Sequence, residues 1–387
     1  MPTVEELFAP PPEVAAHPAV TAMTRLCDDV IGPHAPAADD PARGVDPAHL
    51  RALAAAGLLS VRVPVAEGGF GATQRVDIET VELLAGACGA TWFVVTQHRN
   101  PQGDSAGPIK GVPEHAYRRG PAAARHRPGL AAGTTTAGIA IAHIRRPGTP
   151  AVRADPAPGG GWRLTGTADW CTGWGLTDMT MVAAHTSAGT TASGRFVFAL
   201  VPTAQRPGLR AGPPQPLAVM GGTRTVALQL DDMAVAPDEV LLDVDAQAWL
   251  AADAVRTADT RPATLGLLRR VLVELERLGV QRDRPEAVDA ALQLGERGAA
   301  LRAEAHALLV DVPAGERLRE RAQLRGEIAE LTVRSANALV AARAGGAMLL
   351  SSPEQRWARE ASFHLVQGQT ELLRRTQLAA FAHPGQH

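Results

Sequence analysis

Cysteine and lysine side chains could act as nucleophiles or metal ligands, but in this chain they are few and scattered. Cys27, Cys88 and Cys171 lie far apart, without the short spacing of a zinc site or the even number of a disulfide framework. Lys110 is the only lysine and lies in a loop-like segment, PIKGVP. The sequence therefore argues against a metal site and against Schiff-base or phosphate-loop lysine chemistry.

Composition excludes two further classes of protein. The 387 residues are 45% hydrophobic, enough for a large core in two or three domains. The 38 basic and 40 acidic residues leave a net charge of −2, which argues against a nucleic-acid partner. No apolar run reaches the ~20 residues that cross a membrane, and MPTVEELFAPPPEV is not a signal peptide. We expect a cytoplasmic protein with no membrane partner.

The hydrophobic pattern changes period along the chain. Residues 46–59 and 77–87 repeat apolar side chains every three or four positions, which predicts helices. Residues 98–128 are rich in glycine, proline and arginine, so we expect a loop or a weakened helical segment there. From 131 to about 243, short alternating stretches between Gly/Pro turns predict an antiparallel β-sandwich or barrel.

Beyond residue 246 the helical period returns. Breaks at RDRP, at DVPAG and before Pro353 predict an antiparallel bundle of four helices. The predicted helices span 253–279, 286–310, 315–347 and 354–381. The expected fold class is therefore mainly α with a central β-domain: an N-terminal helical domain (1–130), a β-domain (131–245) and a C-terminal four-helix bundle (246–387).

This order of parts and five separate segments resemble the acyl-CoA dehydrogenase superfamily. LRALAAAGLLSVRVPVAEGGFGAT is similar to the family's N-terminal signature, and WRLTGTADWCTG to its β-segment. MGGTRTVALQLDDMAVAPDEVL is similar to the strand that leads into the bundle, and AGGAMLLSSPEQRWARE and QTELLRR resemble the last two helices. The segments occur in the family's order over nearly the whole chain. The resemblance implies FAD as the cofactor, bound between the β-domain and the bundle.

The same resemblance implies which residues surround the flavin ring. Trp170 would form an aromatic wall, and Thr172 would contact N5 through its hydroxyl and main chain. Taken alone, both would be ordinary residues of a β-core. The strand IAIAHIRRPGTP takes the place of a flavin-facing loop but lacks the family's Thr-Glu-Pro letters. Within it, His143, Ile144 and Thr149 are the residues expected to reach the cofactor.

Two segments correspond to the family's site for the adenylate half of FAD. QRDRPEAV offers Arg282 and Arg284 but lacks the family's phenylalanine. AARAGGAM has alanine in place of the family's glutamine but keeps Gly345 and Gly346. Thr370 matches the family's threonine beside the flavin. Because these family sites are shared between subunits, we expect a homodimer or homotetramer.

The catalytic base of the family is missing from both of its known positions. Dehydrogenation of an acyl thioester requires a carboxylate that removes the α-proton, and a positioned base contributes ~10²–10⁴-fold to the rate. The two positions correspond here to Gly368 and Thr260. Asp259, Glu371 or His364 could substitute, although Asp259 could equally cap a helix and the other two could lie on a solvated helix face. Arg261 is an electrostatic partner for the substrate or a member of an internal ion pair.

A branch of the superfamily without this glutamate uses reduced flavin and O₂ to oxygenate nitrogen or sulfur. Such an enzyme needs a dry pocket with a polar group near the flavin rather than a base for an α-proton. His98, at the end of TWFVVTQH, would lie on a helix that lines the pocket, and His364 could face it. The alternative for His98 is a histidine at a helix end, stabilised by the helix dipole.

The sequence thus predicts a flavin oxidoreductase that acts on the CH–CH group of an acyl thioester carried by CoA or an acyl carrier protein. The alanine-, glycine- and arginine-rich composition associates it with bacterial specialised metabolism. An electron-transfer protein or a flavin reductase would be its redox partner. The alternatives are a flavin-dependent monooxygenase and a flavin-free scaffold with a non-redox or binding role.

Overall fold

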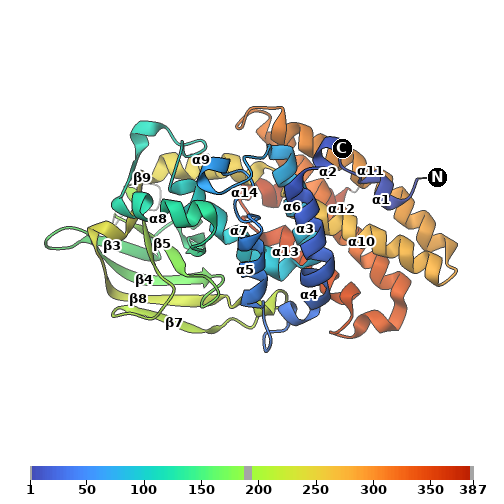
Figure 1. Ribbon diagram of the computed structural model, residues 1–387, viewed down its shortest axis with the longest axis horizontal. Coiled ribbons are helices and arrows are strands. Elements are labelled where there is room, and N and C mark those ends of the chain that lie inside the picture. The colour runs from blue at the N-terminus through green and yellow to red at the C-terminus, as the bar shows by residue number, and fades with distance from the viewer. Residues whose placement is uncertain (1, 187–193, 384–387) are drawn as a thin grey trace.

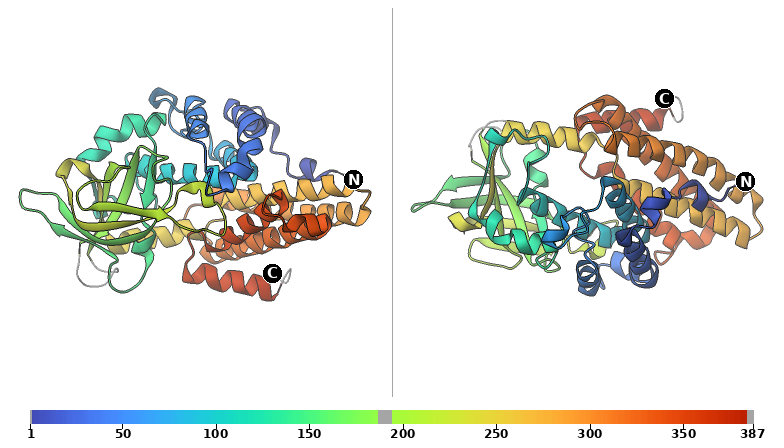
Figure 2. Two further views of the ribbon diagram at one scale, coloured as in Figure 1. Left: turned by 90° about the horizontal axis from the view of Figure 1, so that it is seen from below. Right: turned by 45° about the horizontal axis from the view of Figure 1, so that its top comes forward.

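The computed structural model of the chain describes residues 2–186 and 194–383. A β-sheet lies at one end of the molecule and helices at the other (Figure 1). The long C-terminal helices run side by side away from the sheet, and the N-terminal helices cover one side of them (Figure 2). This arrangement confirms the predicted fold class. Within the described ranges, no helix is long and apolar enough to span a membrane.

Polar caps fix where the N-terminal helices begin. At the start of α5, Asp46 accepts a hydrogen bond from the Ala48 N–H (2.8 Å), and Thr73 accepts one from the Val76 N–H at the start of α6. The helices of this part are α1 (Val4–Leu7), α2 (Pro12–Ala15), α3 (Pro18–Leu26), α4 (Gly32–Asp39), α5 (Pro47–Ala55), α6 (Gln74–Ala87) and α7 (Gly89–Asp104), with a π-helical turn (Cys27–Ile31) after α3.

The segment 98–128 is more regular than its sequence suggests. Helix α7 extends into it, a short strand β1 (Tyr117–Arg119) follows, and α8 (Pro121–Ala132) begins with a proline at its first position. The buried face of α8 consists of alanines and Leu130. Because alanine differs little from polar residues in hydrophobicity, this helix left no clear period in the sequence. Of the two expected alternatives, the helical segment is correct for α8 and the loop is not.

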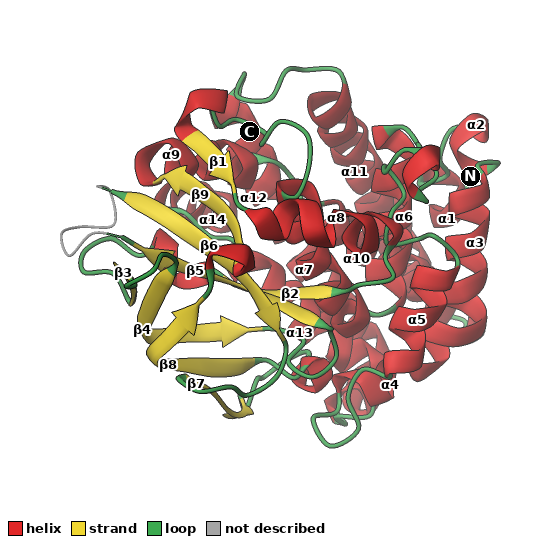
Figure 3. Cartoon of the chain, turned by 60° about the vertical axis from the view of Figure 1, so that its left-hand side comes forward, coloured by secondary structure: helices red, strands yellow, loops and turns green. Residues whose placement is uncertain are grey.

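Within the described residues, nine strands form one sheet, which is mixed rather than wholly antiparallel (Figure 3). Strand β2 pairs with β5 in parallel, and β3 meets β5 in parallel at a single residue pair. The strand order is β1–β9–β6–β5–β3–β4–β8–β7. The strands are β2 (Ala137–Ala140), β3 (Val152–Pro156), β4 (Trp162–Cys171), β5 (Met179–His185), β6 (Arg195–Pro202), β7 (Leu209–Pro214), β8 (Val226–Val235) and β9 (Val240–Asp245). The sequence missed the parallel pairs because β2 follows helix α8 rather than a hairpin turn.

The central strand β6 explains the two-residue period of RFVFALVP. Phe196 and Phe198 point to one face of the sheet and pack on Trp249 of α9 (Ala246–Ala258), with ring centroids 5.6 and 6.0 Å away. Val197 and Ala199 point to the other face, where β4 and β8 complete a second core. Both faces of the strand are therefore buried, one under helices and one under the folded-over sheet.

The C-terminal part departs from the four predicted helices, because two of them are broken. The predicted helix 253–279 consists of α9 and α10 (Pro262–Gln281), since Pro262 cannot continue α9. The predicted helix 354–381 consists of α13 (Pro353–Val366) and α14 (Glu371–Ala382), separated where Gly368 adopts φ +59°. The remaining helices are α11 (Pro285–Val310), α12 (Leu318–Arg343) and a short 3₁₀ helix (Ala344–Met348).

Arg325 on α12 ties the two helix breaks together. Its guanidinium donates hydrogen bonds to the main-chain oxygens of Thr257, near the end of α9, and Gln367, just after α13. Carbonyls at helix C-termini have no partner within their own helix, so a buried guanidinium satisfies both. The ends of two helices distant in sequence are thereby held at one place.

Helices α6 and α10 approach each other at a pair of glycines. A Cβ atom placed on Gly266 would lie 2.1 Å from the Glu82 carbonyl oxygen, and one placed on Gly86 would lie 2.8 Å from the Gly266 carbonyl oxygen. Any larger side chain would push the helices apart. This contact joins the N-terminal helices to the bundle.

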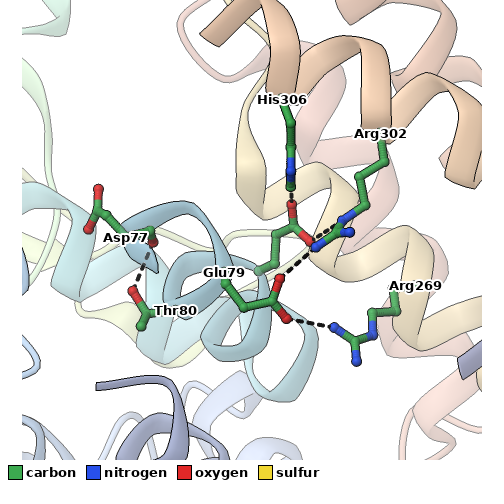
Figure 4. Close-up of polar contacts among 7 residues, drawn as sticks. Asp77, Glu79, Thr80, Arg269, Arg302 and His306 are labelled. Atoms are coloured by element: carbon green, nitrogen blue, oxygen red, sulfur yellow. Dashed lines mark hydrogen bonds and ion pairs between the residues drawn. The ribbon is translucent and has the colours of Figure 1, made fainter. Parts of the chain in front are cut away.

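A buried ionic network reinforces the same contact (Figure 4). Arg302 of α11 donates to Glu82 (2.7 Å) and to Glu79 (2.5 Å), both on α6. Arg269 of α10 also binds Glu79 (2.9 Å), and His306 contacts Glu82 (2.7 Å). Glu79 and Glu82 are only 2% and 1% exposed, so their charges depend on these partners.

We expect Gly266→Ala to lower the free energy of unfolding by about 1–3 kcal/mol, because the added methyl group overpacks the α6–α10 contact. Gly103→Ala is the matched control. It also replaces a helical glycine, but the space around it is open, so it should be neutral or slightly stabilising. Urea unfolding measures both changes. Equal stabilities for the two variants would contradict the close contact.

Candidate functional site

A cavity of about 750 Å³ lies where the three parts of the chain meet. Its wall combines residues of α7, of β4, of the loop that precedes β8, of the α9–α10 break and of the C-terminal end of α13. A volume in this range suits an organic cofactor or substrate. Aromatic and aliphatic side chains form much of the lining, among them Trp92, Phe93, Ile139, Ile141, Trp170 and Phe363.

The β-sheet side of the cavity presents Trp170 and Thr172, whose contact with a cofactor stays a prediction. Trp170 is 44% exposed, which is unusual for a large aromatic side chain unless a partner covers it. Thr172 is buried, and its Oγ1 lies 3.0 Å from Oγ1 of Thr225, another lining residue. The aromatic face and the hydroxyl group thus lie on the same wall.

The Thr172 hydroxyl ends a chain of hydroxyl groups whose protons have a fixed direction. Thr223 donates to the Met220 carbonyl (2.8 Å), which uses its only proton. Thr225, 2.9 Å from Thr223 Oγ1, must then donate to Thr223, and Thr172 must donate to Thr225. The Thr172 oxygen is left with free lone pairs. It therefore presents a hydrogen-bond acceptor to the cavity.

The helical side of the cavity is charged. Arg99 of α7 binds Asp77 of α6 through two hydrogen bonds of 2.8 and 2.9 Å. Arg145 binds Asp253 of α9 in the same way, at 2.7 and 2.9 Å. Although burial alone would raise the pKa of Asp253, its hydrogen bonds and charge interaction with Arg145 hold that pKa below the usual value. Asp253 is therefore ionised, and both lining carboxylates are paired with arginine.

The two positions of the missing base lie at the helix breaks, next to Arg261. Gly368 lines the cavity, and a Cβ atom placed on it would lie 3.4 Å from Nη2 of Arg261. Thr260 is buried, and its hydroxyl has no hydrogen-bond partner. Neither residue can accept a proton as a carboxylate does.

The acidic residues considered as substitute bases lie elsewhere. Asp259 binds Arg321 (2.5 Å) and is absent from the cavity lining; it does not cap α10, whose N-cap residue is Arg261. Glu371 is exposed at the start of α14 and pairs with Arg375. Arg261 does line the cavity. Of the two roles considered for Arg261, the internal ion pair is not formed with any described residue.

The histidines considered for catalysis are buried against the protein rather than exposed to the cavity. His98 accepts from the Ala137 N–H at Nδ1 (3.2 Å) and donates to the Leu130 carbonyl from Nε2 (3.1 Å). His364 contacts Thr264 Oγ1 (3.2 Å), and its ring centroid lies 5.3 Å from that of Trp92. Burial lowers the pKa of His98 to about 4 and that of His364 to about 3. Both rings are neutral near pH 7.

The segment IAIAHIRRPGTP is not a continuous strand. Strand β2 ends at Ala140, and residues Ala142–Arg145 form a 3₁₀ turn. His143 donates a hydrogen bond from Nε2 to the Ala183 carbonyl oxygen in the sheet (2.9 Å), and Ile144 is buried. Ala142 and Arg145 of the same turn line the cavity, whereas His143, Ile144 and Thr149 do not.

The residues expected to hold the adenylate lie at the opposite end of the bundle. Arg284 donates to the Ala342 carbonyl, so the two adenylate segments, which include Gly345 and Gly346, are neighbours. However, the 20 residues of α10 separate Arg261 from Arg282, a length of ~30 Å. Thr370 caps α14 by accepting from the Leu373 N–H (3.4 Å). The adenylate segments therefore lie far from the cavity of their own chain.

Sequence reasoning missed several residues that shape the cavity. Thr225 lies in a segment that carries the resemblance, but its contact with Thr172 spans 53 residues. The Arg145–Asp253 pair spans 108 residues and the Arg99–Asp77 pair 22. Pairs so far apart leave no local spacing signal.

Solved structures share this architecture. A dibenzothiophene monooxygenase, TdsC from Paenibacillus sp. A11-2, is 19% identical with a TM-score of 0.75 over 94% of this chain and 97% of that chain. Butyryl-CoA dehydrogenase from Megasphaera elsdenii is 15% identical, with a TM-score of 0.72 over 97% of this chain and 100% of that chain. The chain has the acyl-CoA dehydrogenase fold.

A third structure extends the comparison to a flavin complex. Glutaryl-CoA dehydrogenase from Mycobacterium smegmatis, in complex with FADH2, is 16% identical with a TM-score of 0.75 over 98% of each chain. No protein-family model matches the sequence, and no curated protein sequence is similar to it. At such identities the comparison establishes the fold, and the chemistry must be argued from the cavity.

The buried histidines predict how stability depends on pH. His98, His143 and His364 have folded pKa values of about 4, 4 and 3, all lowered by burial from 6.5. Between pH 6.5 and about 4 the unfolded chain binds protons that the folded chain does not. The free energy of unfolding should therefore fall with falling pH, by up to ~1.4 kcal/mol per pH unit for each histidine.

Urea unfolding at pH 7, 6 and 5 measures this dependence. His98→Asn should reduce the loss below pH 6.5, because asparagine takes up no proton on unfolding. His115→Asn is the control, since His115 is exposed. An unchanged pH dependence in His98→Asn would refute the buried neutral state of this ring.

Proposed function

We propose that the chain is a flavin-dependent oxidoreductase that binds the isoalloxazine ring of FAD in this cavity, against Trp170 and Thr172. The fold, which the chain shares with flavin enzymes, supports this proposal. So does the cavity itself, where a half-exposed indole and a buried hydroxyl lie on one wall. A flat ring system with polar edges needs both features.

The hydroxyl chain favours the reduced cofactor. Thr172 presents an acceptor to the cavity, because its proton is directed to Thr225. Reduced flavin carries an N–H group at N5, whereas oxidised flavin offers a lone pair there. A ring bound against Thr172 is therefore better matched when it is reduced.

The absence of an available base among the described cavity residues decides the reaction class that we propose. The two lining carboxylates, Asp77 and Asp253, each bind arginine through two hydrogen bonds. The lowered pKa of Asp253 makes it a poor proton acceptor. Gly368 and Thr260 occupy the positions where the resemblance places a glutamate. Removal of an α-proton from an acyl thioester has no evident acceptor here.

The function best supported is therefore oxygenation with reduced flavin. Reduced flavin supplies two electrons, by which one atom of O₂ enters the substrate and the other leaves as water. The chain contributes a largely apolar chamber, the acceptor at Thr172 and the aromatic wall at Trp170. A flavin reductase or an electron-transfer protein would supply the reduced cofactor. Oxidation of the CH–CH group of a CoA- or carrier-bound acyl thioester is the second candidate, favoured by the fold of the acyl-CoA dehydrogenases.

We further propose that the protein is a homo-oligomer. The adenylate segments cannot serve the cavity of their own chain, because the length of α10 separates them from it. They would contact FAD of a second copy. Exposed apolar side chains surround these segments, with Val280, Met348, Leu349 and Leu350 between 61% and 81% exposed. Such a cluster is typical of a surface that another protein covers.

Two assays on the purified protein separate the reaction classes. Under anaerobic conditions, we expect acyl-CoA thioesters of several chain lengths to leave the absorbance of the bound FAD unchanged. With a flavin reductase and O₂, we expect oxygen consumption to be coupled to product rather than to hydrogen peroxide. Bleaching of the flavin by a thioester would establish the dehydrogenase instead. If the protein does not bind added FAD, the remaining alternative is a flavin-free scaffold with a non-redox or binding role.

Thr172→Val tests the cofactor wall. Loss of one hydrogen bond to reduced flavin, worth ~0.5–1.5 kcal/mol, should lower the two-electron midpoint potential by ~10–30 mV. Thr96→Val is the control, since Thr96 also lines the cavity but lies outside the hydroxyl chain. Spectroelectrochemistry measures both variants. A raised potential in Thr172→Val would mean that this hydroxyl donates to oxidised flavin.

A further inference from the structure

Arg261 differs from the other arginines that line the cavity. Arg99 and Arg145 bind aspartates through paired hydrogen bonds, and Arg256 lies 3.7 Å from Asp253 and donates to the Lys110 carbonyl (2.9 Å). The guanidinium of Arg261 forms no ion pair and no hydrogen bond with any residue that the structure describes, and its Nε is buried without a partner. It is a cation in the cavity wall that the protein leaves unsatisfied.

The charges around Arg261 do not compensate for it. Four arginines but only two aspartates line the cavity, a surplus of two positive charges. Asp253 is shared between Arg145 and Arg256, so it offers little to a third guanidinium. Asp259, two residues before Arg261, instead binds Arg321. Burial, and then the charge of Arg145, lowers the pKa of Arg261.

The backbone holds Arg261 at the mouth of an open space. Arg261 is the N-cap residue of α10, at a break that Arg325 fastens to the end of α13. Across from it stands Gly368, where even a Cβ atom would lie 3.4 Å from Nη2. The glycine leaves this side of the guanidinium free for a ligand.

We propose that Arg261 binds an anionic group of the substrate, a carboxylate in a molecule that also carries an aromatic or apolar part. The proposal rests on the proposed function, in that it concerns the substrate of the same cavity. A guanidinium binds a carboxylate through two parallel hydrogen bonds, and a bound anion removes the cost of a buried unpaired charge. Trp92, Phe93 and Phe363 supply an aromatic surface for the rest of the molecule.

The flavin phosphates are the other possible source of an anion. Arg261 belongs to the helical wall of the cavity, whereas Trp170 and Thr172 belong to the sheet wall against which we place the flavin ring. We therefore assign the arginine to the substrate and not to the cofactor. The two assignments make opposite predictions for flavin binding.

Calorimetric titration with matched probes tests the assignment. Benzoate, phenylacetate and 3-phenylpropanoate are each compared with the corresponding amide, which has nearly the same shape without the charge. The wild-type protein, titrated with and without FAD, should bind at least one carboxylate about tenfold more tightly than its amide. Arg261→Gln should abolish this preference, and Arg261→Lys should keep part of it. Arg210→Gln, which removes an exposed charge on β7, should behave as wild type.

Titrations with FAD, FMN and riboflavin complete the experiment. We expect Arg261→Gln to change the three affinities equally or not at all. A selective loss of FAD and FMN binding would assign Arg261 to the cofactor phosphates and overturn the proposal. So would equal affinity of the wild type for every acid and its amide, or a preference that survives in Arg261→Gln. The titrations without FAD measure carboxylate binding whether or not the protein binds flavin. A failure of the flavin proposal can therefore be told apart from a failure of the Arg261 proposal. If Arg261→Gln does not fold, the preference of the wild-type protein and of Arg261→Lys for a carboxylate over its amide tests the assignment.

Discussion

The contact between α6 and α10 is the constraint on which the arrangement of the cavity depends. Glycines at 86 and 266 let the two backbones touch, and the carboxylates of Glu79 and Glu82 are then buried against Arg302. Burying such charges is costly unless every partner is in place, so the network tolerates little displacement. It fixes the N-terminal helices on the bundle. Helix α7, which follows α6 directly, thereby faces α10 and α13 at the distance that leaves a cavity.

The part of the cavity wall that contains Arg261 and Gly368 is formed by irregular backbone at two helix breaks. The breaks after α9 and α13 place main-chain carbonyls inside the protein, where Arg325 satisfies them. Continuous helices would carry Arg261 and Gly368 onto other faces of the bundle. At these breaks, Gly368 and Thr260 stand where the resemblance places a glutamate, and Arg261 contributes a cation to the cavity wall. The proposed reaction class and the proposed charge of the substrate both depend on these three residues.

The sequence predicted the three parts and their order, because hydrophobic period reports directly on which faces are buried. It also singled out Trp170, Thr172 and Arg261, which line the cavity, while their roles there stay predictions. Its predictions were wrong at two helix breaks. The hydrophobic period continues across Pro262 and Gly368, so it predicted one helix at each place where the structure has two. It could not find the partners of Asp77, Asp253 or Thr172, which lie 22 to 108 residues away. Asp259 and His98 were candidates for catalysis because their residue types can transfer protons. In the tertiary fold, however, Asp259 binds Arg321 and His98 binds main-chain groups.

The hydroxyl chain couples hydrogen bonding at Thr172, in the cavity wall, to hydrogen bonding at the Met220 carbonyl. Each hydroxyl has one proton, so the three protons can reverse only together. A ligand atom that required a donor from Thr172 would turn all three hydroxyls, and the Met220 carbonyl would then keep only its hydrogen bond from the Thr223 N–H (3.1 Å). The Met220 N–H is itself bound to Asp39 (2.7 Å), at the end of α4. The three hydroxyl groups therefore switch between two hydrogen-bond directions as one unit. A change in the protonation of a ring bound at Thr172 would change the hydrogen bonding of Met220, where the sheet meets the N-terminal helices.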